Sequence, residues 1–276
     1  MIKIASLQYQ FDFPKSFDAY QEKISRLVDE HAEQGVQLLL FPECAGLEML
    51  SFTSIEKLQE HLPAYLDLFQ ELSHQHRMLI CCGSQTVENF NRSYLFSPSK
   101  KMAYQDKCIR TPFAVGEGSV SEGKTVNLFD TEFGKIGICI CYDSEFPSLA
   151  KKLVHAGAQV ILVPSYTISV HGFNRIFLSC RAGALENQCY VIQSVVVGQT
   201  DAEMTYGAAS VCGPVDDGFP EDGLIALGTR DQPGSVIAEL DLKKLEKVRT
   251  SGQTRNYQDA QRLDQKSISL ELADLR

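Results

Sequence analysis

The sequence predicts an α/β protein. Strand-like segments alternate with amphipathic helical segments along most of its 276 residues. The run VQLLLF (36–41) is apolar throughout, as expected for a strand covered on both faces. The stretches HAEQGVQLLLFPE (31–43) and HAGAQVILVPS (155–165) share the order helix end, tight link, apolar strand and proline. We therefore predict two similar αβ halves within one domain.

The first half begins with an alternating strand, IKIASLQY (2–9). Ser16 is a good cap for a helix that runs to about residue 34, and Gly35 is a typical stop. After the strand at 36–41, periodic apolar positions predict helices and turn residues delimit strands. The predicted helices are 54–60 and 62–76, and the predicted strands are 78–87, 92–97 and 101–107.

The second half repeats this alternation. The predicted strands are 125–130, 134–141, 159–165 and 189–197, with shorter ones near 208–212, 224–229 and 235–240. The predicted helices are about 145–156 and 171–187. No linker-like stretch separates the halves, so we expect one domain over 1–250. The polar segment 251–276 is expected to be a C-terminal extension, an extended arm or a surface segment.

Charge and composition narrow the range of partners. A net charge of −9 argues against nucleic acid or an anionic membrane surface as the main partner. No apolar run approaches the roughly 18 residues of a membrane span, and the N-terminus resembles a strand more than a signal peptide. Nine cysteines without paired spacing indicate reduced thiols in a cytoplasmic protein. The six histidines never fall at ligand spacing, so neither a metal nor a cofactor is expected.

Three chemically active side chains follow apolar strands. Glu43 follows LLLFP, Lys107 closes AYQD and Cys141 closes GKIGICI. In α/β sheets such strand ends are where functional groups gather. A carboxylate can act as general base, an ammonium can stabilise an oxyanion and a thiol can be the nucleophile, which is the set that acyl transfer at a C–N bond requires. Each residue alone is more often structural; only their combination favours catalysis.

The order of these motifs resembles that of the carbon–nitrogen hydrolases of the nitrilase superfamily. The resemblance rests on LLLFPE (38–43), YQDK (104–107), FGKIGICICYDSEFP (133–147), AGAQVILVPS (156–165) and RAGALENQCYVIQS (181–194). It implies a four-layer αββα sandwich with a Glu–Lys–Cys triad at one rim. By motif, Glu43 is then the general base, Lys107 the oxyanion-stabilising cation and Cys141 the nucleophile. The backbone N–H of Tyr142 is the expected second oxyanion donor.

The resemblance also implies a fourth catalytic residue between the lysine and the cysteine. Glu117 is the best match, six residues before Gly123. Glu122 stands where the family usually has a proline, so the turn is altered. Alternatively, Glu117 is an exposed loop acid.

The residues after Cys141 indicate an amidase-like branch. The chain has no tryptophan and continues with Tyr142 and Asp143, whereas nitrilases typically have Trp-Glu there. Asp143 and Glu145 are expected to cap the helix that follows. The residues expected to line the substrate pocket are Tyr166, Thr167 and His171.

The predicted function is hydrolysis of a small-molecule amide to an acid and ammonia, through a cysteine thioester. Linear amides are the expected substrates. Two alternatives stay open: hydrolysis of an N-carbamoyl or nitrile group, and a non-catalytic member of the fold that binds a metabolite or a partner. The resemblance further implies a homodimer or a higher homo-oligomer.

Overall fold

The protein was analysed as a computed structural model that describes residues 1–112, 120–274 and 276. The first half contains five strands and two α-helices, with two short 3₁₀ turns between β2 and α2. Its elements are β1 (Ile2–Tyr9), α1 (Phe17–Glu33), β2 (Leu38–Leu40), η1 (Ala45–Ser51), η2 (Leu58–His61), α2 (Leu62–His76), β3 (Leu79–Val87), β4 (Phe90–Phe96) and β5 (Met102–Asp106).

The second half continues the alternation and ends in two helices. Its strands are β6 (Leu128–Thr131), β7 (Gly134–Ile138), β8 (Val160–Ser165), β9 (Tyr190–Val196), β10 (Gly198–Gln199), β11 (Met204–Thr205), β12 (Ser210–Cys212), β13 (Leu224–Leu227) and β14 (Gly234–Leu240). Its helical segments are η3 (Cys141–Glu145), α3 (Pro147–His155), α4 (Val170–Asn187), α5 (Leu242–Ser251) and α6 (Asn256–Asp264).

The strands join into two half-sheets that meet at β1 and β9. The order is β5-β4-β3-β2-β1-β9-β8-β7-β6, with β14 paired to β1, β12 to β9 and β13 to β12. β1 and β9 are parallel but pair only at Gln8–Val195 and Tyr9–Val196. This short junction lets the two half-sheets turn against each other.

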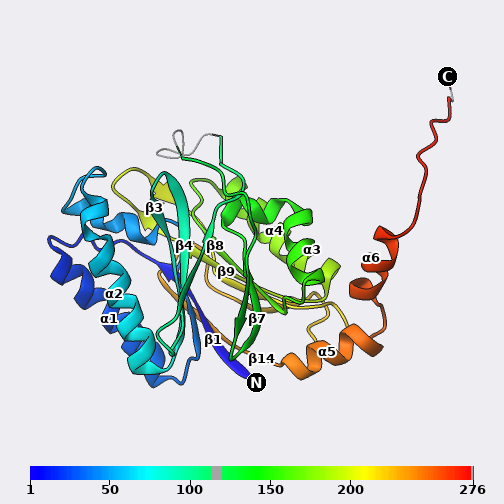
Figure 1. Ribbon diagram of the computed structural model, residues 1–276, viewed down its shortest axis with the longest axis horizontal. Helices are drawn as coiled ribbons and strands as arrows, with labels where there is room; N and C mark the ends of the chain where they lie inside the picture. The colour runs from blue at the N-terminus through cyan, green and yellow to red at the C-terminus, as the bar shows by residue number, and fades with distance from the viewer. Residues whose placement is uncertain (113–119, 275) are drawn as a thin grey trace.

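Four layers result, as the sequence predicted. Figure 1 shows α1 and α2 on one side of the strands and α3 and α4 on the other. The two faces of β2 show why its sequence is apolar throughout: Leu38 and Leu40 belong to the core that includes the second half-sheet, and Leu39 packs into the core under α1 and α2. Because successive side chains of a strand point to opposite faces, a strand between two cores must be apolar at every position.

Most predicted elements are present with shifted ends, and two predictions need correction. The predicted helix 54–60 is wrong: this stretch forms turns and the 3₁₀ segment η2, and the α-helix starts at Leu62 with Pro63 in its first turn. Proline suits that position, where its missing N–H costs no helical hydrogen bond. The strand predicted over 134–141 ends at Ile138, because Asp143 bonds back to Ile140 and turns the chain.

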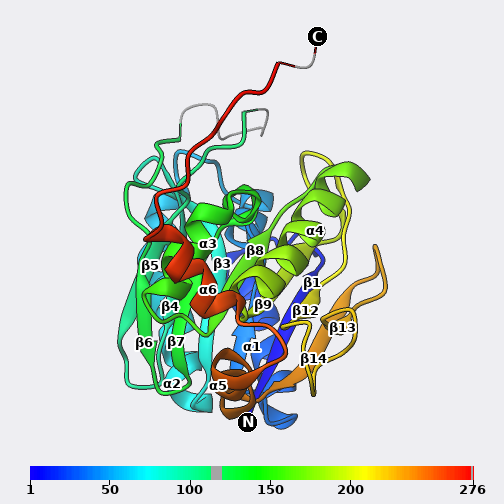
Figure 2. The ribbon, with the colours of Figure 1, turned by 90° about the vertical axis from the view of Figure 1, so that its right-hand side faces the viewer.

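The C-terminal segment is more ordered than an extended arm. α6 lies beside α3 and α4 (Figure 2), and its Asp264 forms an ion pair with Lys151 of α3. Residues 266–274 have no helix or strand and are exposed. The polar composition of 251–276 concealed α6, because this helix buries no complete side chain and depends on contacts with α4 and α5.

A buried arginine anchors α5 to the rest of the molecule. Arg249 is 3% exposed, and its guanidinium donates to Gln188 O and Ala158 O, each at 2.8 Å. The Cζ atom of Arg249 also lies 4.4 Å from the centroid of the Tyr257 ring. Arg249 therefore connects α5 to α6, to the end of α4 and to the link between α3 and β8.

We expect Arg249→Met to lower the free energy of unfolding by about 1–3 kcal/mol, because two buried carbonyls lose their donors. Urea unfolding followed by circular dichroism measures this change. Arg255→Met is the matched control, since Arg255 is exposed, and should change stability by less than about 0.5 kcal/mol. Equal effects of the two substitutions would contradict the anchoring role.

Candidate active site

Glu43, Lys107 and Cys141 lie in one cavity of about 350 Å³. Glu43 follows β2, Lys107 follows β5 and Cys141 lies three residues beyond β7. Their exposed fractions are only 3%, 4% and 6%. The structure therefore brings these three predicted residues together in one cavity, where each of them is almost completely buried.

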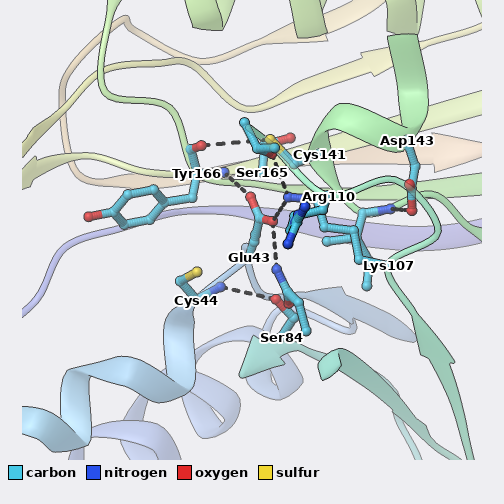
Figure 3. Close-up of polar contacts among 12 residues, drawn as sticks. Glu43, Cys44, Ser84, Lys107, Arg110, Cys141, Asp143, Ser165 and Tyr166 are labelled. Atoms are coloured by element: carbon cyan, nitrogen blue, oxygen red, sulfur yellow. Dashed lines mark hydrogen bonds and ion pairs between the residues drawn. The ribbon is translucent and has the colours of Figure 1, made fainter. Parts of the chain in front are cut away.

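The Glu43 carboxylate receives hydrogen bonds from three separate parts of the chain. Oε1 accepts from Lys107 Nζ at 2.8 Å and from Asn91 Nδ2 at 2.9 Å. Oε2 accepts from the backbone N–H of Tyr166 at 3.0 Å (Figure 3). A buried charge is costly unless it is paired and hydrogen-bonded, and these donors meet that requirement for Glu43.

A close approach of β3 supports the backbone on either side of Glu43. The N–H of Ser84 donates to Pro42 O at 3.3 Å, and Ser84 Oγ accepts from the N–H of Cys44 at 3.2 Å. Gly83, the residue before Ser84, has a φ of +74° and allows this contact, because a Cβ at this position would stand 1.9 Å from Pro42 O. Glycine adopts such a φ without strain. These contacts with β3 thus fix the direction of the backbone at Glu43, in the segment that follows β2.

Cys141 occupies a strained position at the start of η3. Its φ is +47°, in the left-handed region that side-chain-bearing residues rarely adopt. Its Sγ donates to Tyr166 O at 3.6 Å, so the Tyr166 main chain contacts both the thiol and the Glu43 carboxylate. Strain of this kind persists only where surrounding structure enforces it, and it clusters at functional sites.

The thiol of Cys141 is protonated at rest. Burial raises its pKa well above the ordinary value, and the negative charge of Glu43 raises it further. The charge of Lys107 and the contact with Tyr166 O act in the opposite direction but are weaker. A nucleophile in this state needs a base to take its proton.

Asp143 connects the lysine loop to the cysteine turn. Its buried carboxylate accepts backbone N–H groups from Cys108 at 3.1 Å, Ile109 at 2.8 Å and Ile140 at 3.1 Å. These donors directly follow Lys107 and directly precede Cys141. The expectation that Asp143 caps the next helix is wrong: α3 begins at Pro147, and Asp143 instead holds two loops together.

The other predicted site residues are distributed as follows. Tyr142, Tyr166 and Thr167 line the cavity. His171 lies in the first turn of α4 with an exposed side chain, and it is not among the described residues that line this cavity. Glu117 lies outside the residues that the structure describes.

Sequence reasoning missed several residues of the site. Asn91 donates to Glu43, and Thr111 Oγ1 accepts from Lys107 Nζ at 2.9 Å. At the cavity mouth it missed Arg175, Asp201 and Glu203. Asn91 lies inside a strand and the others lie in a loop, a helix and a hairpin turn, where polar residues are common. No sequence signal marked them.

The described residues contain neither a candidate metal site nor a helix that could cross a membrane. Residues 1–112, 120–274 and 276 contain no group of three or more His, Cys, Asp or Glu side chains placed to hold a metal ion. Within the same ranges, no helix has the length and apolar character needed to cross a membrane.

Comparison with known sequences gives one family. The profile of the carbon-nitrogen hydrolase family matches residues 3–250. The probable hydrolase YhcX of Bacillus subtilis is 30% identical over 95% of this chain, which spans 54% of that relative's length. A deaminated glutathione amidase of Synechocystis is 25% identical over 83% of this chain and 88% of its own length.

Solved structures give the same fold. Nit3 of Saccharomyces cerevisiae, a member of the nitrilase superfamily, superposes with a TM-score of 0.75 at 22% identity, covering 91% of this chain and 93% of its own. An amidase from Nesterenkonia, also of the nitrilase superfamily, gives a TM-score of 0.71 at 19% identity, covering 90% and 95%.

The burial of Asp143 predicts a pH dependence of stability. Burial raises its pKa to about 6, against 3.8 ordinarily, so between these values the folded chain holds a proton that the unfolded chain lacks. The stabilising contribution is present below about pH 4 and lost as the pH rises through about 6. Relative to Asp143→Asn, the wild-type free energy of unfolding should fall by roughly 1–3 kcal/mol between about pH 4 and pH 7. Urea titrations of both proteins test this, and a difference that rises with pH would refute it.

The charges around Cys141 predict how the reactivity of its thiol changes in variants. Glu43→Gln removes a negative charge and should lower the pKa of Cys141, while Lys107→Met removes a positive charge and should raise it. Alkylation by iodoacetamide near pH 8 should therefore be faster in Glu43→Gln and slower in Lys107→Met, by about tenfold per pKa unit. Intact mass spectrometry follows the reaction.

Cys141→Ala gives the background labelling of the other eight cysteines. Circular dichroism shows whether each variant is folded. Slower alkylation in Glu43→Gln than in the wild type would contradict the charge argument.

Proposed function

The chain belongs to the carbon-nitrogen hydrolase family of the nitrilase superfamily, and we propose that it hydrolyses a small-molecule amide through a thioester on Cys141. The observation that carries this proposal is the meeting of a buried carboxylate, ammonium and thiol in one cavity. The name of the Synechocystis relative, a deaminated glutathione amidase, is consistent with amide chemistry. This chain spans only about half the length of the Bacillus relative. The proposal therefore concerns the activity of this chain and not that of the whole relative.

In the first half-reaction, Cys141 Sγ attacks the amide carbonyl carbon and Glu43 accepts the thiol proton. Glu43 suits this task because its Oε2 and the Cys141 thiol both contact the Tyr166 main chain. The thiol is protonated at rest, so proton transfer must accompany attack.

The tetrahedral intermediate carries a negative oxygen. We assign its stabilisation to Lys107 Nζ and to the backbone N–H of Tyr142, the residue directly after the nucleophile. Because Lys107 and Cys141 are almost completely buried, an oxyanion beside them is shielded from bulk water and these donors interact with it more strongly than they would in water. The C–N bond then breaks, Glu43 returns its proton to the nitrogen, and ammonia leaves a thioester on Sγ.

In the second half-reaction, water attacks the thioester carbon while Glu43 accepts a proton from it. The C–S bond breaks, the proton returns to sulfur, and the carboxylic acid is released. Atoms balance: one amide and one water give one acid and one ammonia. No other co-reactant is needed.

We expect Cys141→Ala to abolish ammonia release from amides while the protein stays folded. Cys139→Ala is the matched control, because Cys139 lies two residues earlier and is 1% exposed, but does not line the cavity. That variant should keep most of the activity. An acid quench during turnover should add the mass of the acyl group to the wild type and not to Cys141→Ala. Full ammonia release by Cys141→Ala would refute the mechanism.

A substrate panel distinguishes this function from its alternatives. Amides, N-carbamoyl compounds and nitriles are offered to the purified protein, and ammonia is measured. Amides should give the highest kcat/KM. Turnover confined to nitriles or N-carbamoyl compounds would replace the amidase assignment, and no turnover of any class would favour a binding role.

A further inference from the structure

The cavity above Cys141 has apolar walls. Two 3₁₀ residues, two loop residues, one helix residue and one residue after β1 supply aliphatic or aromatic side chains: Phe11, Leu47, Leu50, Ile55, Ile168 and Ile176. Ile55 and Ile168 are each nearly half exposed and are available to a ligand. At about 350 Å³ the cavity is at the small end of ligand sites, about 300–1,000 Å³. Apolar walls favour an apolar acyl group.

Both cations among the described lining residues are already bonded to carboxylates. Lys107 contacts Glu43 at 2.8 Å. Arg175 Nε contacts Glu145 Oε1 at 3.2 Å. A substrate carboxylate that approached Arg175 would have to compete with Glu145 and would lie near its negative charge.

Two further carboxylates line the cavity, and neither has a cationic partner among the described residues. Asp201 and Glu203 belong to the turn between β10 and β11, and neither forms an ion pair with a described residue. This turn is held in place: Thr200 Oγ1 accepts from the N–H of Glu203 at 3.1 Å and shares a hydrogen bond with Tyr166 Oη at 3.0 Å. These bonds keep the turn that carries both carboxylates against the cavity wall.

The described lining therefore carries two more carboxylates than cations. We propose that the substrate is an amide with an uncharged, apolar acyl group, and that Asp201 and Glu203 are specificity-determining residues that exclude carboxylate-bearing amides. The inference rests on the proposed amidase function. Repulsion of a competitor is as effective a source of specificity as attraction of the preferred ligand. The net charge of −9 adds a long-range repulsion of anions.

The test uses two amides of the same shape and different charge. Glutaramate has a carboxylate at the end of its acyl chain, and 5-methylhexanamide has an isopropyl group in the same place. We expect kcat/KM for ammonia release to be at least about tenfold higher for 5-methylhexanamide, a tenfold difference corresponding to about 1.4 kcal/mol. The ratio should increase at low ionic strength, because salt screens the exposed carboxylates.

Variants assign the discrimination to the two carboxylates. Asp201→Asn/Glu203→Gln should lower the ratio several-fold, mainly by improving glutaramate turnover. Glu22→Gln/Glu33→Gln is the matched control: it removes the same charge from exposed positions of α1 and should leave the ratio unchanged. Arg175→Gln tests the competing view that Arg175 receives a carboxylate, and a selective loss of glutaramate turnover in it would overturn the proposal.

A binding measurement tests the proposed substrate preference separately from the proposed amidase function. Titration calorimetry with Cys141→Ala should show tighter binding of 5-methylhexanamide than of glutaramate. Turnover of both amides with equal or reversed preference would overturn the specificity and leave the amidase function intact. Absence of turnover with any amide would overturn the function, and the binding order would still decide the preference of the pocket.

Discussion

The hydrogen-bonded carboxylate of Glu43 is the interaction on which the arrangement of the site depends. Its donors come from β4, from the end of β5 and from the segment after β8, so a single buried charge joins both half-sheets at one rim. Removing such a charge from water is costly, and these hydrogen bonds offset that cost. The same requirement that satisfies Glu43 therefore brings Lys107 and the Tyr166 main chain beside it.

Asp143 is a second buried carboxylate that holds separate parts of the chain together, outside the lining of the cavity. Glu43 gathers groups that face the cavity, whereas Asp143 gathers backbone N–H groups that do not. Because its donors flank Lys107 and Cys141, it sets the distance between the two loops without touching the cavity. Two buried carboxylates thus hold the loops around the cavity: Glu43 bonds to groups that line it, and Asp143 bonds to the backbone beside Lys107 and Cys141.

The sequence predicted that Glu43, Lys107 and Cys141 lie together but did not predict the residues that support them, for a physical reason. Glu43, Lys107 and Cys141 each follow an apolar strand, and strand pairing is a periodic property that brings such ends together. Asn91 lies inside β4 and looks like any polar strand residue. Asp143 looked like a helix cap because its donors at Cys108 and Ile109 are 35 and 34 positions away along the chain. For the same reason α6, which depends on contacts with α4 and α5, could not be recognised from its own residues.

The pKa of a thiol does not identify the nucleophile in this protein. Burial raises the pKa of Cys139 as it does that of Cys141, and both thiols are protonated at rest. What differs is the backbone: β7 ends at Ile138, and the left-handed conformation at Cys141 directs this residue into the cavity with Glu43 and Lys107. In the proposed mechanism this buried thiol stays neutral until the amide substrate binds, and its proton then passes to the Glu43 carboxylate. The left-handed conformation of Cys141 is thus the structural difference between two buried cysteines that stand two residues apart.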